Sequence, residues 1–439
     1  MAGNDFVPGS NTDLETPEIA KVYESAGVDA INVTGGWHET RVPQLPMDLP
    51  RTAYAFLALN IKNAVSVPVM ASNRIADPFS AEKIIRDGYA DMVNLGRVLI
   101  ADPEWPKKAF EGKENEIRPC VACSQGCTDQ VFSGQPVYCA GNPRSAFEGE
   151  RKIVKTASPK RVMVVGAGPA GLEAAVTASQ AGHYVELYEK DTDIGGQLWI
   201  AGAPPHKKEL LEFIRYYTAM IKKYGIPLYL NTNVNVELIK SKNPDQLIIA
   251  EGAEAIIPPI AGVDNPGVIT AWGLLKDDRI LGKDVAVIGG GAVGLETAMF
   301  IAAKGTITPE ILHFLFAYEA ETVDRLREIM FTGTSRVTVF EMLPKAGSDV
   351  GKSTKWVLFD NLKRYGVNII TNAKVISIDG GSVQYDHGGV RETMTFDNVV
   401  LASGSRSVNR LSQGLEKLGI PYVLIGDCVK PGKIDTAIH

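Results

Sequence analysis

The first 115 residues alternate between short apolar runs and stretches with the spacing of amphipathic helices. The apolar runs have the length of buried strands, and strands that alternate with helices predict a parallel α/β sheet. Three such rounds fall short of a closed (β/α)8 barrel, which takes about 250 residues, so we expect a small open sheet or the last part of a barrel. Thr16 and Ser80 are the predicted caps of the first and third helices. The predicted elements are helices at 16–27, 52–64 and 80–88, and strands at 28–33, 67–72 and 91–95.

Polar residues follow each of these predicted strands. His38 follows the first strand, Asn73 and Arg74 follow the second, and Gly96 and Arg97 follow the third. In a barrel the carboxyl ends of the strands hold the ligand, and the last two strands commonly bind a phosphate. Gly96 lets a ligand approach the backbone closely, and the Arg97 guanidinium can bind a phosphate through two parallel hydrogen bonds. The alternatives are a surface ion pair for each arginine and a hydrogen-bonded structural role for His38.

Residues 161–197 have the pattern of a dinucleotide-binding fold. A strand at 161–165 runs into a glycine-rich turn, in which the first glycine makes the bend, the second lets a pyrophosphate approach, and the third allows close helix packing. An acidic residue lies eighteen residues past the last glycine, at the end of the next strand, where it can accept hydrogen bonds from a ribose. In the Gly-Gly-Gln stretch that follows, the lack of side chains again lets the dinucleotide approach the backbone closely. The predicted contacts are Gly166, Gly168, Gly171, Glu189, Gly196 and Gln197.

The same pattern returns at residue 284, with the glycines Gly289, Gly291 and Gly294. Its acidic partner, Glu341, lies 47 residues past Gly294, because residues 304–335 look like an insertion with a helical stretch from 309 to 330. Glu341 would repel a 2′-phosphate, which favours NADH over NADPH.

Two later segments are expected to return to the first fold, so that the second fold is nested within it. They are the strand at 398–401 and the stretch at 424–427. Asp427, after Gly426, can meet a flavin ribityl hydroxyl in such a pair of folds; the alternative is an ordinary acidic turn residue. No Cys-x-x-Cys pair lies near either nucleotide fold, which argues against disulfide chemistry.

Four of the five cysteines lie within twenty residues, between the first sheet and the nucleotide folds. Four thiolates on one short, turn-rich segment can hold a soft metal centre. Two disulfides are one alternative, and zinc is another. Zinc ribbons usually have two matched Cys-x2-Cys pairs, whereas the spacings here are two, three and eleven, so we favour an iron–sulfur centre. The predicted ligands are Cys120, Cys123, Cys127 and Cys139.

The charge and hydropathy patterns exclude several classes of partner. The net charge is −6, with acidic and basic residues interspersed, which gives no nucleic-acid footprint. No apolar run reaches the roughly 18 residues that a membrane span needs. We find no targeting segment, and a reducing, cytoplasmic location is the expectation.

Several of these motifs together resemble the 2-enoate reductase and 2,4-dienoyl-CoA reductase family, relatives of old yellow enzyme and trimethylamine dehydrogenase. The resemblance rests on residues 35–39, 72–75, 96–97, 118–144 and, in the second fold, 343–345 and 351–353. It implies an FMN-holding barrel, a [4Fe–4S] cluster, an FAD domain and an NAD(P)H domain. Electrons would pass from NADH through FAD and the cluster to FMN, and then to the β-carbon of an activated alkene.

The resemblance also assigns roles to residues of this chain. The four clustered cysteines would hold the cluster, the first glycine turn with Glu189 and Gln197 would hold FAD, and the second turn with Glu341 would hold NADH. Asn73, Arg74, Gly96 and Arg97 would lie by the FMN phosphate. His38 would polarise the substrate or assist proton delivery. The expected parts are a partial flavin barrel (1–115), an iron–sulfur segment (116–150), an FAD-binding domain (151–275 and 395–439) and an NAD(H)-binding domain (276–394).

The chain departs from the family pattern at both ends. By the resemblance, we expect it to begin after about five of the barrel strands and to end before a helix that closes the FAD domain in the family. Three interpretations follow: an ene reductase, an electron-transfer subunit that works with a separate barrel chain, or a fragment without activity. The expected substrate is an enoate or enoyl thioester if the barrel is completed. Exposed sheet edges predict a homo-oligomer or a partner chain.

Overall fold

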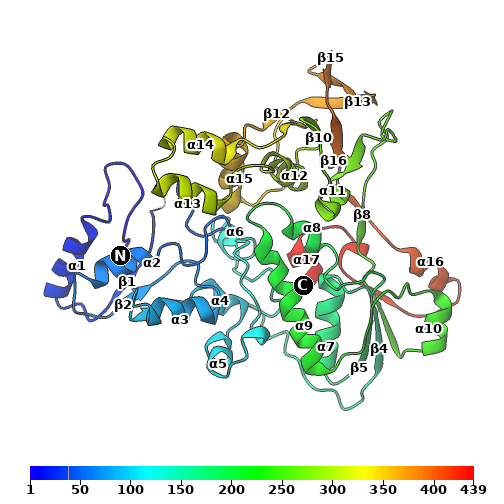
Figure 1. The fold of residues 1–439 in the computed structure, drawn as a ribbon. Helices are drawn as coiled ribbons and strands as arrows, with labels where there is room; N and C mark the ends of the chain where they lie inside the picture. Colours follow the sequence, from blue (N-terminus) through cyan, green and yellow to red (C-terminus); the bar gives the residue numbers. More distant parts are fainter. Residues whose placement is uncertain (38) are drawn as a thin grey trace.

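The computed structural model describes residues 1–37 and 39–439, so the predictions for His38 lie outside the described residues. Figure 1 shows an N-terminal unit in blue, a first nucleotide fold in green with its last helices in red, and a second nucleotide fold in yellow to orange. A central segment, with α6 (Thr128–Val131) and the short 3-10 helix η1 (Glu114–Glu116), lies between them. Every helix among the described residues is too short or too polar to cross a bilayer.

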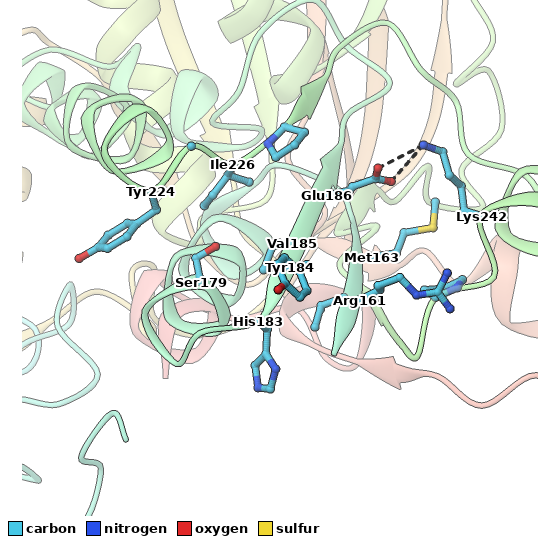
Figure 2. Close-up of a pocket in the computed structure, with 14 residues that line it drawn as sticks. Arg161, Met163, Ser179, His183, Tyr184, Val185, Glu186, Tyr224, Ile226 and Lys242 are labelled. Atoms are coloured by element: carbon cyan, nitrogen blue, oxygen red, sulfur yellow. Dashed lines mark hydrogen bonds and ion pairs between the residues drawn. The ribbon is translucent and has the colours of Figure 1, made fainter. Parts of the chain in front are cut away.

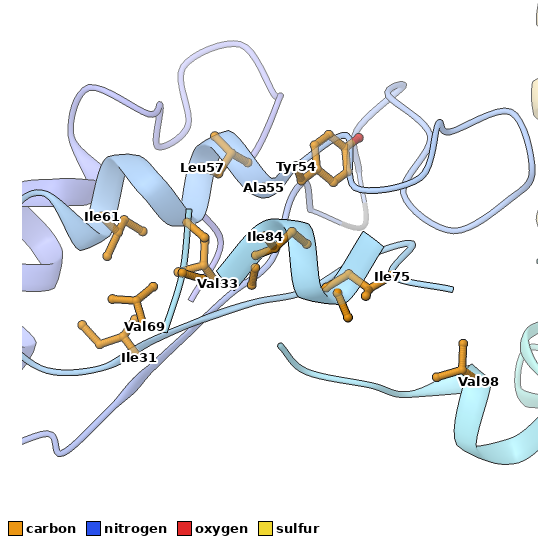
Figure 3. Packing of buried hydrophobic residues seen from close by; sticks show 14 of the residues in the cluster. Ile31, Val33, Tyr54, Ala55, Leu57, Ile61, Val69, Ile75, Ile84 and Val98 are labelled. Carbon is orange, nitrogen blue, oxygen red and sulfur yellow. The ribbon is translucent and has the colours of Figure 1, made fainter. Parts of the chain in front are cut away.

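The N-terminal unit is built on a three-stranded parallel sheet. Its elements are α1 (Thr16–Ser25), β1 (Ile31–Val33), α2 (Ala55–Lys62), β2 (Val69–Ala71), α3 (Pro78–Arg86), β3 (Met92–Val93), α4 (Arg97–Ala101) and α5 (Trp105–Phe110). The strand order is β1-β2-β3. Leu57 and Ile61, one turn apart on α2, share a buried cluster with Ile31 and Val69 of the strands (Figure 3). Phe110, at the end of α5, stays 94% exposed. The three predicted strand–helix rounds and their parallel sheet are confirmed.

Two helices begin differently from the prediction. Asp77, and not Ser80, caps α3, since its carboxylate accepts a hydrogen bond from the Ser80 backbone N–H at 2.8 Å. Pro78 fills the first helical position, so the last residue with extended backbone is Asp77. Thr16 lies inside α1, where its hydroxyl donates to the Gly3 carbonyl instead of capping the helix.

The first nucleotide fold is a five-stranded parallel sheet in the order β18-β7-β4-β5-β6, covered by helices. Val164, Leu172 and Tyr217 are fully buried between the sheet and its helices. Its elements are β4 (Arg161–Val165), α7 (Pro169–Gln180), β5 (Tyr184–Tyr188), α8 (Leu198–Gly202), η2 (Lys208–Leu211), α9 (Glu212–Tyr224), β6 (Leu228–Tyr229), α10 (Val236–Lys242), β7 (Gln246–Ile249), α16 (Arg410–Glu416), β18 (Val423–Leu424), η3 (Gly426–Cys428) and α17 (Ile434–Ile438).

The second nucleotide fold has its own five-stranded parallel sheet, in the order β12-β11-β10-β16-β9. Its elements are β9 (Val268–Thr270), α11 (Ala271–Asp277), β10 (Asp284–Ile288), α12 (Ala292–Ala302), β11 (Arg336–Phe340), α15 (Lys352–Arg364), β12 (Asn368–Ile370) and β16 (Asn398–Leu401). The prediction that the strand at 398–401 returns to the first fold is wrong, because Asn398 pairs with Val285 of β10. The strand at 268–270, also predicted with the first fold, pairs with β16. Only β18 returns to the first sheet, since a local apolar run does not specify which sheet it joins.

Further strands and helices lie outside the two parallel sheets. A three-stranded antiparallel sheet is formed by β13 (Ala373–Asp379), β14 (Ser382–His387) and β15 (Val390–Thr395). A pair of antiparallel strands, β8 (Ala253–Ala255) and β17 (Ser405–Ser407), connects the two nucleotide folds. The predicted helical insertion is two helices, α13 (Pro309–Ala317) and α14 (Val323–Phe331). No side chain of α13 is buried, so the insertion is a surface feature as expected.

A buried ion-pair network joins the central segment to the first nucleotide fold. Arg118 donates two hydrogen bonds to the Glu173 carboxylate of α7, at 2.9 and 3.2 Å, and a third to the Gly141 carbonyl. Tyr217 of α9 and Arg144 also donate to Glu173. Burial raises the pKa of Glu173, but the guanidinium of Arg118, with Arg144 and Tyr217, outweighs it and holds the pKa below its ordinary value. The carboxylate is therefore charged at neutral pH and fixes the segment in place.

Replacing Glu173 by glutamine leaves the guanidinium of Arg118 buried without its counter-charge. We expect the free energy of unfolding to fall by about 3 kcal/mol, measured by urea denaturation. Because the folded-state pKa is lowered, this contribution is present at neutral pH and is lost as the pH falls through that pKa. The matched control is Asp245→Asn, which breaks an exposed pair with Arg161 and should change little. A Glu173→Gln protein as stable as the parent would contradict the role of the network.

Candidate functional site

The glycine-rich turn of the first nucleotide fold has no room for a side chain at two of its predicted positions. A Cβ on Gly166 would lie 2.3 Å from the Ala250 carbonyl oxygen, and its φ of +100° also favours glycine. A Cβ on Gly171 would lie 1.9 Å from the Gly166 oxygen. A Cβ on Gly168 would have no neighbour within 4 Å among the described residues. The turn is therefore tight at its ends and open at its middle, which is the shape that a pyrophosphate requires.

The acidic residue predicted for the first fold contacts this turn. Glu189 is buried, and its carboxylate accepts hydrogen bonds from the backbone N–H groups of Ala167 at 2.7 Å and Asp191 at 3.0 Å. The carboxylate thus lies at the carboxyl end of β5, beside the glycine turn, where a ribose of a bound dinucleotide would lie.

The other predicted contacts of the first fold meet on the open side of the turn. A Cβ on Gly196 would lie 3.1 Å from the Gly168 Cα. Gln197 donates a hydrogen bond to the Asp427 carboxylate at 3.0 Å, although the two residues are far apart in sequence. Gly426 has φ +67°, and a Cβ there would lie 2.6 Å from a side chain of α7. These residues, with the glycine turn, fit the phosphates and ribityl chain of FAD.

The second glycine turn repeats the geometry of the first. A Cβ on Gly289 would lie 2.4 Å from the Ala402 oxygen, and one on Gly294 would lie 1.9 Å from the Gly289 oxygen. Glu341 accepts from the Gly290 N–H at 2.7 Å, as Glu189 does from its own turn. The turn differs above its middle glycine, Gly291, where the carboxylate of Asp349 lies 3.3 Å from the position of a Cβ.

The four clustered cysteines line a single pocket, as predicted. No group of three or more histidine, cysteine or acidic side chains in the described part of the chain is arranged to hold a metal ion. The backbone at Ala122, Gln125 and Gly141 only partly opposes the rise in the pKa values of Cys120, Cys123 and Cys139 that burial causes. Four sulfurs that line one pocket are a donor set that fits a thiolate-bound metal centre.

Burial dominates the electrostatics of these thiols. It raises the pKa of Cys123 to about 12 and that of Cys139 to about 11, and the neighbouring cysteines raise both further. Burial also raises the pKa of Cys120, although the nearby guanidinium of Arg97 opposes it. Thiolates at these positions therefore need a bound cation to offset the repulsion between them.

Backbone strain marks the same loop. Ala122 has φ +50° and Ser124 has φ +61°, so the residues on both sides of Cys123 lie in the left-handed region without being glycine. Such conformations cost about 1 kcal/mol or more each and occur often at ligand clamps. The sequence pattern found the cysteines but not this strain.

The residues after β2 occupy a strained loop against the first nucleotide fold. Asn73 and Arg74 have φ +69° and +55°. The Arg74 side chain is only 2% exposed; it forms an ion pair with Glu209 of η2, and its Nε donates to the Leu49 carbonyl at 3.0 Å. The alternative interpretation of an ion pair thus describes Arg74, except that the pair is buried. A contact of Arg74 with an FMN phosphate stays a prediction.

The residues after β3 lie on the side of the cysteine pocket. Arg97 lines that pocket, and it donates to the Leu45 carbonyl at 2.8 Å. A Cβ on Gly96 would have no neighbour within 4 Å among the described residues. Both guanidinium groups expected at an FMN phosphate, Arg74 and Arg97, therefore contact protein atoms, and their contact with FMN stays a prediction.

One ion pair between the nucleotide folds has no sequence signal. Lys207 of the first fold lies 2.8 Å from Glu296, on the first turns of α12 in the second. Burial lowers the pKa of Lys207, but Glu296 and Asp48 outweigh it and the pKa ends above its ordinary value. The two residues are distant in sequence, so their pairing follows from the docking of the folds.

A second pocket lies at the other edge of the first sheet (Figure 2). It is lined at the amino ends of β4 and β5, away from the glycine turn. Its charged groups are paired: Lys242 with Glu186 at 3.2 Å, and Arg161 with Asp245 at 3.1 Å. None of the predicted site residues lines it, and we assign it no cofactor.

Comparison with known proteins agrees with this geometry. Residues 160–426 match the pyridine nucleotide-disulphide oxidoreductase family, and residues 15–116 match the NADH:flavin oxidoreductase / NADH oxidase family. The chain belongs to the 2-enoate reductase family of flavin oxidoreductases. This enoate reductase-type chain carries an FAD- and NAD-binding part and a partial FMN-barrel part.

Three of the similar proteins are named as reductases, each of a different acceptor. A metal reductase of Desulforamulus reducens is 42% identical over 100% of this chain and 66% of its own length. A bilirubin reductase of Mediterraneibacter gnavus is 36% identical over 94% of this chain and 60% of its own. The structure of a 2-naphthoyl-CoA reductase has a TM-score of 0.89 at 32% identity, over 100% of this chain and 63% of the other. This family member thus spans slightly less than two thirds of their length.

The middle and last glycines of the first turn give a testable contrast. Alanine at Gly168 has free space in the protein and an allowed backbone (φ −74°), but its methyl would meet a bound pyrophosphate. We expect Gly168→Ala to fold normally and bind FAD roughly tenfold more weakly. Gly171→Ala should disrupt the turn itself, because its Cβ would lie 1.9 Å from an oxygen. Circular dichroism and flavin absorbance after gel filtration measure the two effects; full FAD retention in Gly168→Ala would contradict the assignment.

Proposed function

We propose that this chain is the electron-input part of an NADH-dependent flavin and iron–sulfur reductase of the 2-enoate type. In this proposal the second glycine turn holds NADH, the first holds FAD, and the four cysteines hold a [4Fe–4S] cluster. When bound, these groups would supply hydride transfer from the nicotinamide to the flavin, with release of the proton, and one-electron transfer through the cluster toward FMN and a C=C bond. The protein's own part is to bind these groups and to exclude water between them.

The position of the cysteine pocket, which is lined by Arg97 of the N-terminal unit and Phe213 of the first nucleotide fold, supports this proposal most directly. On one side, Arg118, two residues before Cys120, donates a hydrogen bond to Glu173, which lies near the N-terminus of α7. On the other, Asp129, two residues past Cys127, accepts hydrogen bonds from Ser353 at the start of α15. Four thiols so placed would receive electrons from the first fold while the second stays docked nearby.

The different acceptors of the relatives support separate roles for the part that they share with this chain and for the rest of their length. Proteins named for the reduction of a metal, of bilirubin and of a naphthoyl thioester all match nearly the whole of this chain, which covers 60% to 66% of their length. The shared part would then supply the electrons, and the remaining third would help to select the acceptor. We propose an enoate or enoyl thioester as the substrate of a completed barrel, supplied by a partner chain or by further sequence.

A second candidate function is electron transfer without alkene reduction by this chain alone. The observation that favours it is the buried ion pair of Arg74 with Glu209, which gives one of the two expected phosphate ligands a partner within the protein. We therefore expect the purified chain to reduce an artificial acceptor with NADH faster than it reduces any enoate. Anaerobic steady-state assays with both acceptors measure this, and a dominant enoate rate would refute it. Counting FMN and FAD per chain separates the two functions independently.

Replacing Cys123 by serine tests the metal centre. The other three thiols cannot complete a four-thiolate set, so we expect visible iron–sulfur absorbance and the content of iron and sulfide to fall to a small fraction of the parent. Cys428→Ser is the matched control, because Cys428 is buried elsewhere and its thiol donates to the Ile425 carbonyl. Unchanged iron in the Cys123 variant would remove the cluster from the proposal.

A further inference from the structure

The two glycine turns differ in what covers their middle glycine. Above Gly168 of the first turn the described protein leaves open space, whereas Gly291 of the second lies under the Asp349 carboxylate. Both oxygens of Asp349 accept from the backbone N–H of Ala292, at 3.0 and 3.1 Å. Ala292 is the first residue of α12, and the first turn has Pro169, without an N–H, at the same place.

The N–H that Asp349 contacts belongs to the pyrophosphate site of a dinucleotide fold. The first N–H groups of a helix have no partner within it and point outward, with the positive end of the helix dipole. A pyrophosphate binds at this end of the helix that follows the glycine turn. A carboxylate has the same charge sign and the same acceptor oxygens, so the two anions exclude each other.

Asp349 lies on a short strap, residues 346–353, that crosses the turn. The Gly347 N–H donates to the Gly290 carbonyl at 2.7 Å, and the Ala346 Cβ lies 3.2 Å from a Cβ position on Gly290. Asp349 itself is exposed, so its side chain can leave Ala292 for water without breaking a buried contact.

The far end of the strap is held by the cysteine segment. Asp129 accepts from the backbone N–H of Ser353 at 2.8 Å and from its hydroxyl at 2.6 Å. A Cβ on Gly351 would lie 2.1 Å from an Asp129 oxygen, so the strap passes close to the carboxylate. Movement of Asp349 is thus limited to the part of the strap before Gly351.

We propose that Asp349 sets the affinity of the second fold for its dinucleotide by acting as an internal competing anion. Its carboxylate holds the Ala292 N–H in the free protein, and the pyrophosphate replaces it on binding. This inference rests on the proposed role of the second fold as the NADH site. It makes Asp349 an affinity-determining residue that weakens binding and speeds the release of oxidised cofactor.

The test is calorimetric titration of the FAD-loaded protein with ADP-ribose, which has the pyrophosphate but no nicotinamide. Asp349→Asn keeps the shape and removes the charge, so we expect ADP-ribose to bind about two- to fivefold more tightly. Adenosine, which has no phosphate, should bind both proteins equally. Asp360→Asn is the matched control: it removes the same charge from α15, where Asp360 pairs with Arg364, and should leave the affinity unchanged.

The outcomes separate the two proposals. If the parent binds ADP-ribose and Asp349→Asn binds it equally or more weakly, the competing role of Asp349 is wrong and the NADH site stands. If adenosine binding tightens to the same extent, the effect is not at the pyrophosphate and the inference again fails. If neither protein binds ADP-ribose, the proposed NADH site itself is wrong, and this inference fails with it.

Discussion

The carboxylate of Glu173 is the interaction on which the arrangement of this protein depends. It lies fully within the protein, where a lone charge would be prohibitive, and it is stabilised only because Arg118 and Arg144 arrive from the cysteine segment. Tyr217 completes its hydrogen bonds from α9. A displaced segment would leave these charges unpaired in an apolar interior. The network therefore gives the cysteine pocket one position relative to the first glycine turn.

The other junctions follow the same rule. Arg74 of the barrel part meets Glu209 of the first fold, Lys207 of the first fold meets Glu296 of the second, and Asp129 of the cysteine segment caps the second fold at Ser353. Each is a charged or capped contact between parts that are far apart in sequence. Electron transfer needs fixed distances between cofactors, and directional contacts fix distances better than apolar surfaces, which can slide.

The sequence predicted what is local and missed what depends on docking. The glycine turns and the cysteines were predictable because the spacing of their residues along the chain is itself the signal, although the contact that excludes a side chain at Gly166 comes from Ala250, after β7. The strand at 398–401 was misassigned, since an apolar run fits either parallel sheet until its partner is known. Glu173 had one signal, an acidic residue within an alanine-rich helix that must be buried, but its partner Arg118 could not be inferred from local pattern.

The same limit explains why two nearly identical turns are not equivalent. Gly168 and Gly291 occupy the same place in the same pattern, and their flanking glycines have matching geometry. What lies above them is decided elsewhere: Gly196 packs beside the first turn, and Asp349 covers the second. An open, preformed turn favours high affinity, which suits a cofactor that stays bound. A carboxylate that competes for the same N–H groups lowers the affinity, which suits a cofactor that must leave after each turnover. Tight and exchangeable binding can thus arise from one backbone motif through a single acidic residue that the motif does not contain.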